Sequence, residues 1–461
     1  MQCDVLSAGA DCDAYDTREN RNAVTSFLWI AAVTGAVSLL TPCVVPMIPV
    51  TAAYFSQLSD RGRGWVLRNA LLFAGGIVVT FTGLGLALAL LVGASGLARL
   101  AANPWVNIAI GISFVAFALN LMGFWELRVP FAGSAATHAD ASARARAGSG
   151  SASLFMGFAF TLASFTCTAP FVGPLLVSAA RGDWSRPLLG MLVFSAVFSA
   201  PFFLLAAAPG WTHHLPRPGK WMVELRFIIG LVELGAAIKF FSNADLVWRT
   251  GVISREAIVF SWAALMLIGA IYLARPLIGS RTARHFSVAR SLSVAACLAV
   301  AIWIARGRRE MSLGELEAFL PPEEISDSGG TALASAAGAE SLHHHWILND
   351  HAAALTRARQ TGKLVLIDFT GYTCTNCRWM EAKMFSRPDV STALGNFVLS
   401  RLYTDGEGEI YEKQQAFQER HFGTVALPLY AIVDAEGRTV RTFAGLTRSP
   451  AEFLAFLGAV S

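Results

Sequence analysis

Long apolar stretches without charge occupy the first two thirds of the chain. Residues 22–59, 69–98, 100–125 and 147–180 contain no Asp, Glu, Lys or Arg. Each stretch exceeds the roughly 20 apolar residues with which a helix crosses a hydrocarbon core of about 30 Å. Shorter apolar runs follow at 187–208, 227–247, 257–274 and 291–305. The pattern predicts a polytopic α-helical membrane domain with about eight spans.

From about residue 342 the pattern changes to that of a soluble α/β domain. Helices are predicted after Cys374, around 409–421, and after Ser449, where Pro450 can occupy the first turn. The predicted strands are KLVLIDF (363–369), NFVLSRLYT (396–404), LYAIVD (429–434) and TVRTFAG (439–445). Strand–helix–strand–helix–strand–strand–helix is the element order of the thioredoxin fold.

Composition supports this division of the chain. Hydrophobic residues make up 54% of the 461 residues and charged ones only 15%, against about 25% charged in an ordinary soluble domain. These values exclude a disordered chain and a wholly soluble enzyme, and a net charge of +4 gives no reason to expect a nucleic-acid partner. The predicted parts are an external tail (1–22), a membrane domain (23–305), a linker (306–341) and a thioredoxin-like domain (342–461).

The distribution of charge predicts the orientation in the membrane. With eight spans, four of the connecting loops face one side, and basic residues clearly outnumber acidic ones in them. The first 22 residues are acidic instead. Because cytoplasmic loops are enriched in Lys and Arg, we expect a bacterial inner-membrane protein with both termini in the periplasm. No signal peptide is readable, so either the first span carries the tail outward or an upstream portion precedes it.

The motif Cys374-Thr-Asn-Cys377 lies where a predicted strand runs into the N-terminus of a helix. Unpaired N–H groups and the helix dipole lower the pKa of a cysteine at that position, and the thiolate is the attacking species in disulfide exchange. The second cysteine is placed to resolve a mixed disulfide. A zinc site would need a second ligand pair, and a c-type haem would need His where Arg378 stands. We therefore predict a redox-active pair that requires no metal or organic cofactor.

Three further residues belong to this candidate site. Pro428 is the expected cis-proline of thioredoxin-like folds, although an ordinary proline at the start of a strand would look the same. Asp368 and Glu381 flank the cysteines, and carboxylates close to a thiol raise its pKa and can move its proton. For Glu381, a solvated position on the helix surface is an almost equally good interpretation.

Two more cysteines lie inside predicted spans, in the sequences LLTPCVVPMIPV (Cys43) and ASFTCTAPFVGPLL (Cys167). Each is followed by proline three residues later, which kinks or breaks a helix. Irregular backbone in a bilayer is tolerated where it is buried in protein or lines a cavity. The same device in spans one and four predicts an inverted repeat with Cys43 and Cys167 as one redox pair.

These motifs resemble those of a known family. TPCVVPMIP (41–49) and FTCTAPFVGP (165–174) are similar to the paired membrane motifs of the DsbD/CcdA thiol:disulfide interchange proteins. DFTGYTCTNCRWME (368–381) with LPLYAIVD (427–434) resembles the C-terminal thioredoxin-like domain of DsbD. The resemblance implies that cytoplasmic thioredoxin reduces Cys43 and Cys167, which pass electrons to Cys374 and Cys377. It further implies that Asp368 and Glu381 tune the external pair.

The final acceptor stays open at the level of sequence. Oxidised periplasmic thiol–disulfide proteins and apocytochrome c factors are both compatible with the motifs. Many family members have an N-terminal domain with its own cysteine pair, whereas Cys3 and Cys12 here could be a remnant, a local disulfide or unrelated thiols. Thr166 stands where many members have proline.

A different class of function is the alternative. Glu233 and Lys239 lie inside span six, where ionisable residues are costly and often functional. A small-solute transporter with a tethered thioredoxin-like sensor would also fit an inverted repeat, and Cys43 and Cys167 would then be packing residues.

Overall fold

The computed structural model describes eight stretches of the chain and four isolated positions. These are residues 9–39, 62–124, 150–177, 185–207, 220–279, 288–307, 313–321 and 345–458, with 41, 44, 51 and 55. The chain divides into two compact units, each built from separate segments. Unit 1 comprises Met1–Leu97 and Gly123–Arg226, and unit 2 comprises Ala98–Met122 and Phe227–Ser461.

Unit 1 is a helical bundle with an aromatic core. Its helices are α1 (Gly9–Ser38), α3 (Arg63–Ala102, ending in unit 2), α6 (Gly150–Val177) and α7 (Ser185–Ala207). Phe81 and Phe198 meet edge to face at 5.3 Å between ring centroids. Helices α3 and α6 cross closely at Gly76 and Gly157, where an added Cβ would lie 2.8 Å from Leu154 O and 2.5 Å from Phe73 O, respectively. Small residues allow such close approach of membrane helices.

The membrane helices of unit 2 are α4 (Pro104–Leu121), α9 (Lys220–Trp248, beginning in unit 1), α10 (Arg255–Gly279) and α11 (Val288–Arg306). Every stretch that the sequence marks as a span therefore contains helix in the part of the chain that the structure describes. By length and hydropathy, three described helical segments can cross a membrane: Gly64–Ala87, Pro104–Leu121 and Arg255–Arg275. Shorter apolar segments occur at Val24–Ser38, Gly150–Leu162 and Leu188–Leu204. The count of eight spans and the inverted repeat remain predictions.

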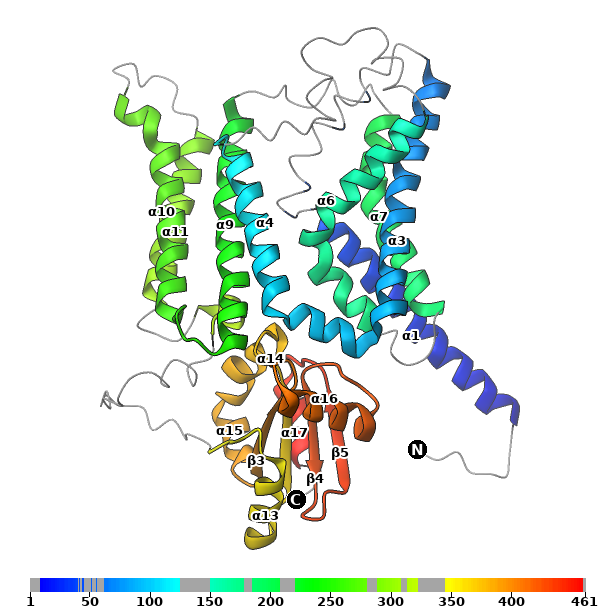
Figure 1. Cartoon of the computed structure of the whole chain (residues 1–461), viewed down its shortest axis with the longest axis vertical. Helices are drawn as coiled ribbons and strands as arrows, with labels where there is room; N and C mark the ends of the chain where they lie inside the picture. Colours follow the sequence, from blue (N-terminus) through cyan, green and yellow to red (C-terminus); the bar gives the residue numbers. More distant parts are fainter. Residues whose placement is uncertain are drawn as a thin grey trace. The chain divides into compact units, whose positions relative to one another are not determined.

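The thioredoxin-like part of unit 2 contains a five-stranded sheet in the order β1-β3-β2-β4-β5. Strands β3, β4 and β5 are labelled in Figure 1. Strands β1 and β3 run parallel to their neighbours, whereas β4 pairs antiparallel with β2 and β5. The strands are β1 (Ile347–Leu348), β2 (Val365–Thr370), β3 (Val398–Tyr403), β4 (Leu429–Val433) and β5 (Thr439–Ala444). The helices are α13 (His351–Thr361), α14 (Thr375–Trp379), α15 (Pro388–Leu394), α16 (Glu409–Phe422) and α17 (Pro450–Gly458).

The central strand β2 is buried on both faces, and its alternation assigns each side chain to one layer. Val365, Ile367 and Phe369 pack in the cluster that includes residues of α13 and α16. Leu366 packs instead in the cluster that includes residues of α15 and α17. Asp368 and Thr370 share the face of Leu366. The residues after the cysteine motif, Met380 and Met384, pack against this face as well.

The predicted linker contains a short ordered element, the 3-10 helix η4 (Gly314–Phe319). Its Glu315 accepts hydrogen bonds from the indole N–H of Trp379 at 3.1 Å and from the Arg448 guanidinium at 3.0 Å. Glu317 forms an ion pair with Arg255 at the start of α10, with 2.7 Å between nitrogen and oxygen. This element therefore touches both the cysteine-bearing helix and a membrane helix of unit 2.

Candidate functional site

The cysteine motif sits at a helix N-terminus, as the sequence predicts. Cys374 is the N-cap of α14, which continues without a break into a π-helical turn, η6 (Met380–Phe385). Its sulfur accepts the backbone N–H of Cys377 at 3.1 Å. The two cysteines form a disulfide with 5.3 Å between their Cα atoms. Cys374 is partly exposed whereas Cys377 is 1% exposed, so an external thiol reaches Cys374 first.

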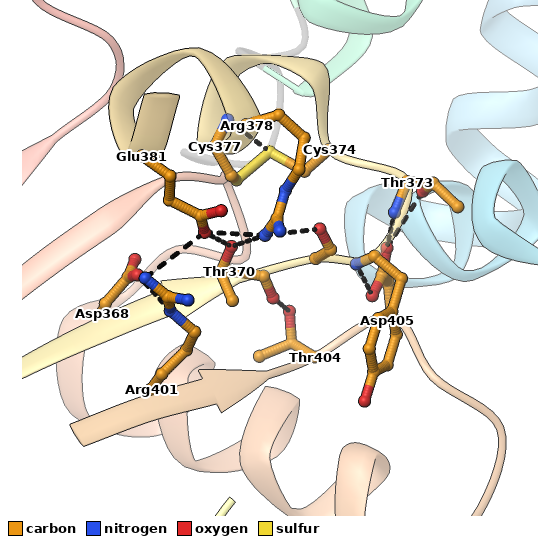
Figure 2. A network of polar contacts seen from close by, with 12 residues as sticks. Asp368, Thr370, Thr373, Cys374, Cys377, Arg378, Glu381, Arg401, Thr404 and Asp405 are labelled. Atoms are coloured by element: carbon orange, nitrogen blue, oxygen red, sulfur yellow. Dashed lines mark hydrogen bonds and ion pairs between the residues drawn. A yellow bond between two sulfur atoms is a disulfide. The ribbon is translucent and has the colours of Figure 1, made fainter. Parts of the chain in front are cut away.

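Asp405 holds the loop between β2 and Cys374. Its carboxylate accepts the backbone N–H of Tyr372 at 2.7 Å and that of Thr373 at 2.9 Å, and the Thr373 hydroxyl also donates to it at 2.9 Å (Figure 2). A Cβ on Gly371 would lie 2.6 Å from Asp405 Oδ2, so this close approach requires glycine. The loop is therefore fixed before the cysteines begin.

A network of four charged side chains lies on the same face of the sheet as the cysteine helix (Figure 2). Arg378 Nη2 donates to Glu381 Oε1 at 2.7 Å and to the Thr370 hydroxyl at 3.0 Å. Arg401 Nε donates to Asp368 Oδ2 at 3.1 Å, and Arg401 Nη2 lies 3.7 Å from Glu381 Oε1. Glu381 is thus shared by two guanidinium groups.

Strand register explains how Asp368 and Arg401 meet. The two residues are direct partners across the parallel pair β2–β3, and Tyr430 is the partner of Asp368 across β4. Partners in a sheet point to the same face. Asp368 and Arg401 are 33 residues apart in the sequence, and the alignment of β2 with β3 brings them together.

Asp368 is 1% exposed, and burial raises its pKa from 3.8 to about 6, against the opposing effect of Arg401. Its Oδ1 has no hydrogen-bond partner within the described part of the chain. A buried carboxyl with a pKa near neutrality can take up and release a proton during thiol chemistry.

The Leu427–Pro428 peptide bond is cis. Because Leu429 pairs with Phe369 across the antiparallel strands, Pro428 lies level with Thr370, at the end of β2 from which the cysteine loop departs. The register therefore places Pro428 at the same end of the strands as the cysteine motif.

The structure describes little of the four cysteines in the N-terminal tail and the membrane domain that the sequence singles out. Cys43 and Cys3 lie outside the described residues. The backbones of Cys167 and Cys12 belong to α6 and α1, but the structure does not describe their side chains. Pairing of Cys43 with Cys167 therefore stays a prediction. Glu233 is 1% exposed in α9.

Sequence reasoning missed the cationic half of the network. In the sequence prediction Arg378 serves only to exclude a haem motif, and Arg401 has no role. The signal for Arg401 was available, because an arginine interrupts the otherwise apolar or small run VLSRLY of a buried parallel strand. Such strands are usually continuous in apolar residues, so a charge within one indicates a buried partner.

The fold and the site define a class: a thioredoxin-like module with a redox-capable cysteine pair, joined to a helical membrane domain. Residues 24–244 match the family model described as "Cytochrome C biogenesis protein transmembrane domain", and residues 346–435 match the model described as "Thioredoxin-like". Together these matches cover both halves of the architecture.

Curated relatives combine the same two parts. The chain is 30% identical to "Thiol:disulfide interchange protein DsbD 2" of Pseudomonas aeruginosa, over 80% of this chain and 60% of the relative. It is 25% identical to the DsbD protein of Ralstonia nicotianae, over 87% of this chain and 63% of the relative. It is 26% identical to the DsbD protein of Vibrio cholerae, over 85% of this chain and 60% of the relative. The chain therefore spans about three fifths of the length of these relatives.

The chain belongs to the DsbD family of thiol:disulfide interchange proteins, and it is a multi-pass membrane protein. Its thioredoxin-like domain is C-terminal to the membrane domain, in the order that the sequence motifs indicate.

Proposed function

We propose that this protein is a transmembrane protein-disulfide reductase that moves two electrons per cycle from cytoplasmic thioredoxin to proteins of the envelope. The observation that carries the proposal is the Cys374–Cys377 disulfide at a helix N-terminus, on the sheet face that holds a buried carboxyl of raised pKa. In one chain with a membrane domain of the cytochrome c biogenesis type, this site is suited to receive electrons from across the membrane.

In the first half of the cycle, electrons from the cytoplasm reduce the Cys374–Cys377 disulfide. Thioredoxin first converts a Cys43–Cys167 disulfide into a dithiol and becomes oxidised itself. One membrane thiolate then attacks Cys374 Sγ, the bond to Cys377 Sγ breaks, and Cys377 leaves as a thiolate that takes a proton. The second membrane thiol loses its proton, attacks the mixed disulfide and releases Cys374. Two electrons reach the Cys374–Cys377 pair, and the membrane pair returns to the disulfide.

In the second half of the cycle, the reduced Cys374–Cys377 pair passes the two electrons to a client disulfide. The Cys374 thiolate attacks a client disulfide, and one client sulfur leaves as a thiolate. Cys377 gives its proton to Asp368, whose pKa near 6 suits it to this exchange, and then attacks Cys374 Sγ to release the reduced client. Pro428 lies at the same end of the strands as the cysteine loop, where we expect it to contact an extended client backbone. Every step exchanges one sulfur–sulfur bond for another, so the cycle needs no cofactor.

The proposed setting is the bacterial inner membrane, with both termini in the periplasm. The clients in this proposal are oxidised periplasmic thiol–disulfide proteins and apocytochrome c factors. The excess of basic residues in alternate loops supports the orientation.

Thiol trapping in cells tests the relay. Cells are quenched with acid, alkylated with a mass-tagged maleimide, and the redox state of Cys374 and Cys377 is read in wild type, in Cys43→Ala and in a thioredoxin-deficient strain. Cys297→Ala is the matched control, because Cys297 lies in a membrane helix but outside the proposed relay. We expect a reduced pair in wild type and in the control, and an oxidised pair in the other two. A pair that stays reduced in all four strains would exclude the relay and favour the transporter function.

A further inference from the structure

The two carboxylates beside the cysteines do not act as an isolated negative pair. Glu381 Oε1 lies 2.7 Å from Arg378 Nη2, and Asp368 Oδ2 lies 3.1 Å from Arg401 Nε. Arg378 is 4% exposed and Arg401 is 5% exposed, so water cannot solvate either cation. Two buried cations are thus matched to two carboxylates.

We propose that Arg378 and Arg401 are positioning residues that cancel the charges of Glu381 and Asp368 and thereby keep the Cys374 thiol acidic enough to attack. The inference rests on the proposed function, because a reductase needs a thiolate at Cys374. It assigns the control of thiol acidity to four residues that act together, rather than to the two carboxylates.

The sign of the effect follows from counting charges. Without the arginines, Glu381 and Asp368 would have a net charge of −1 while Asp368 is protonated and −2 after it releases its proton. With both arginines present, the net charge of the four residues is +1 while Asp368 is protonated and zero after it releases its proton. A nearby negative charge raises the pKa of a thiol and a positive one lowers it. The arginines therefore allow a proton acceptor to sit beside the cysteines without suppressing the thiolate.

Arg378 contacts both acceptors through one nitrogen. Its Nη2 donates to Glu381 and to the Thr370 hydroxyl, and its guanidinium lies 6.0 Å from the ring centroid of Tyr403. A lysine ammonium has the same positive charge and three N–H donors, so the charge-balancing role does not require a guanidinium. Arg378 is also the residue next to Cys377, so its backbone lies in the first turn after the motif.

Other charged or titratable groups face the network from several elements. They are Tyr403 and Asp405 at the end of β3, Tyr430 of β4, and Lys239 of α9, which acts electrostatically with Arg378. Burial raises the pKa of Tyr430 well above its usual value, so Tyr430 stays neutral in the range where the thiols titrate. Asp405 is committed to the cysteine loop by its three hydrogen bonds.

The test measures the acidity of Cys374 in the purified full-length protein in detergent. After reduction with dithiothreitol and its removal, the rate of alkylation by iodoacetamide is followed from pH 5 to 9. Fragment mass spectrometry of the peptide that contains both cysteines reports Cys374 separately from Cys377. We expect Arg378→Gln to raise the pKa of Cys374, so that alkylation at a pH below that pKa is about tenfold slower for each unit of increase. Arg401→Gln should change the rate in the same direction.

Compensating variants separate this role from a merely structural one. Glu381→Gln should speed alkylation at low pH, and Arg378→Gln combined with Glu381→Gln should return the pKa of Cys374 towards wild type, because a cation and an anion are removed together. Arg378→Lys should restore most of the rate. Arg387→Gln is the matched control, since Arg387 pairs with Asp389 on the surface.

Two results would overturn the proposal: an unchanged pKa of Cys374 in Arg378→Gln, or a double variant no closer to wild type than Arg378→Gln alone. Chemical reduction makes the assay independent of electron delivery through the membrane. A failed relay in cells therefore leaves this measurement intact, and a failed pKa effect leaves the relay intact.

Discussion

Replacing Asp368 with asparagine should stabilise the oxidised thioredoxin-like domain, by an amount that depends on pH. Asparagine has nearly the shape of protonated aspartic acid and never ionises. In the wild type, burial raises the pKa of Asp368 from 3.8 to about 6, and this value already includes the attraction of Arg401. Ionising the buried group therefore costs about 3 kcal/mol at neutral pH, at about 1.36 kcal/mol per pKa unit.

The direction with pH follows from linkage. A folded-state pKa above the unfolded one means that the native state is favoured while Asp368 holds its proton. That contribution is complete below pH 3.8 and is lost as the pH rises through about 6. Asp368→Asn should thus differ from wild type by only about 0.5 kcal/mol at pH 4, gain roughly half of the 3 kcal/mol by about pH 5, and gain nearly all of it by about pH 7.

Hydrogen exchange of the backbone amides of β2 and β4, read by mass spectrometry in the oxidised full-length protein, measures this difference. Asp389→Asn serves as the control, because Asp389 is exposed and its hydrogen bond with Arg387 lowers its pKa. That variant should gain no protection as the pH rises. Equal protection of Asp368→Asn and wild type at pH 8, or a gain independent of pH, would refute the assignment of the cost to a buried charge.

Three other predictions concern the cysteine loop. Cys377→Ser should accumulate mixed disulfides through Cys374 on non-reducing gels, whereas Cys374→Ser should form far fewer; equal amounts would contradict the nucleophile assignment. Asp405→Ala removes three hydrogen bonds and should cost about 2 kcal/mol in local stability of residues 371–377 by hydrogen exchange, while Asp434→Ala in the distant turn before β5 should leave that segment unchanged. Gly371→Ala places a Cβ 2.6 Å from Asp405 Oδ2 and should loosen the same segment by about 1–3 kcal/mol; wild-type protection there would show that the loop tolerates a side chain.

Much of the thioredoxin-like domain could be predicted from local patterns. Buried strands such as VLIDFT are recognisable in the sequence as short apolar runs. Pro450 indicates the start of a helix, and Gly437 indicates a turn. Elements without such signals were missed. Strand β1 has two residues, too few for any periodicity, and exists only because Ile347 and Leu348 pair with β3.

The sequence predicts the acidic residues of the candidate site but not Arg401, because only the acidic residues are close to the cysteines along the chain. Asp368 and Glu381 lie within a few residues of the cysteines, so spacing along the chain is enough to select them. Arg401 is 33 residues from Asp368 and becomes its neighbour only when β2 and β3 adopt one register. A shift of that register by one residue would turn Arg401 to the opposite face, into the apolar layer of Val398 and Leu402. The cost of burying an unpaired guanidinium there disfavours the shifted register. The ion pair and the strand alignment therefore specify each other, and the charge balance beside the cysteines is a consequence of the fold as a whole.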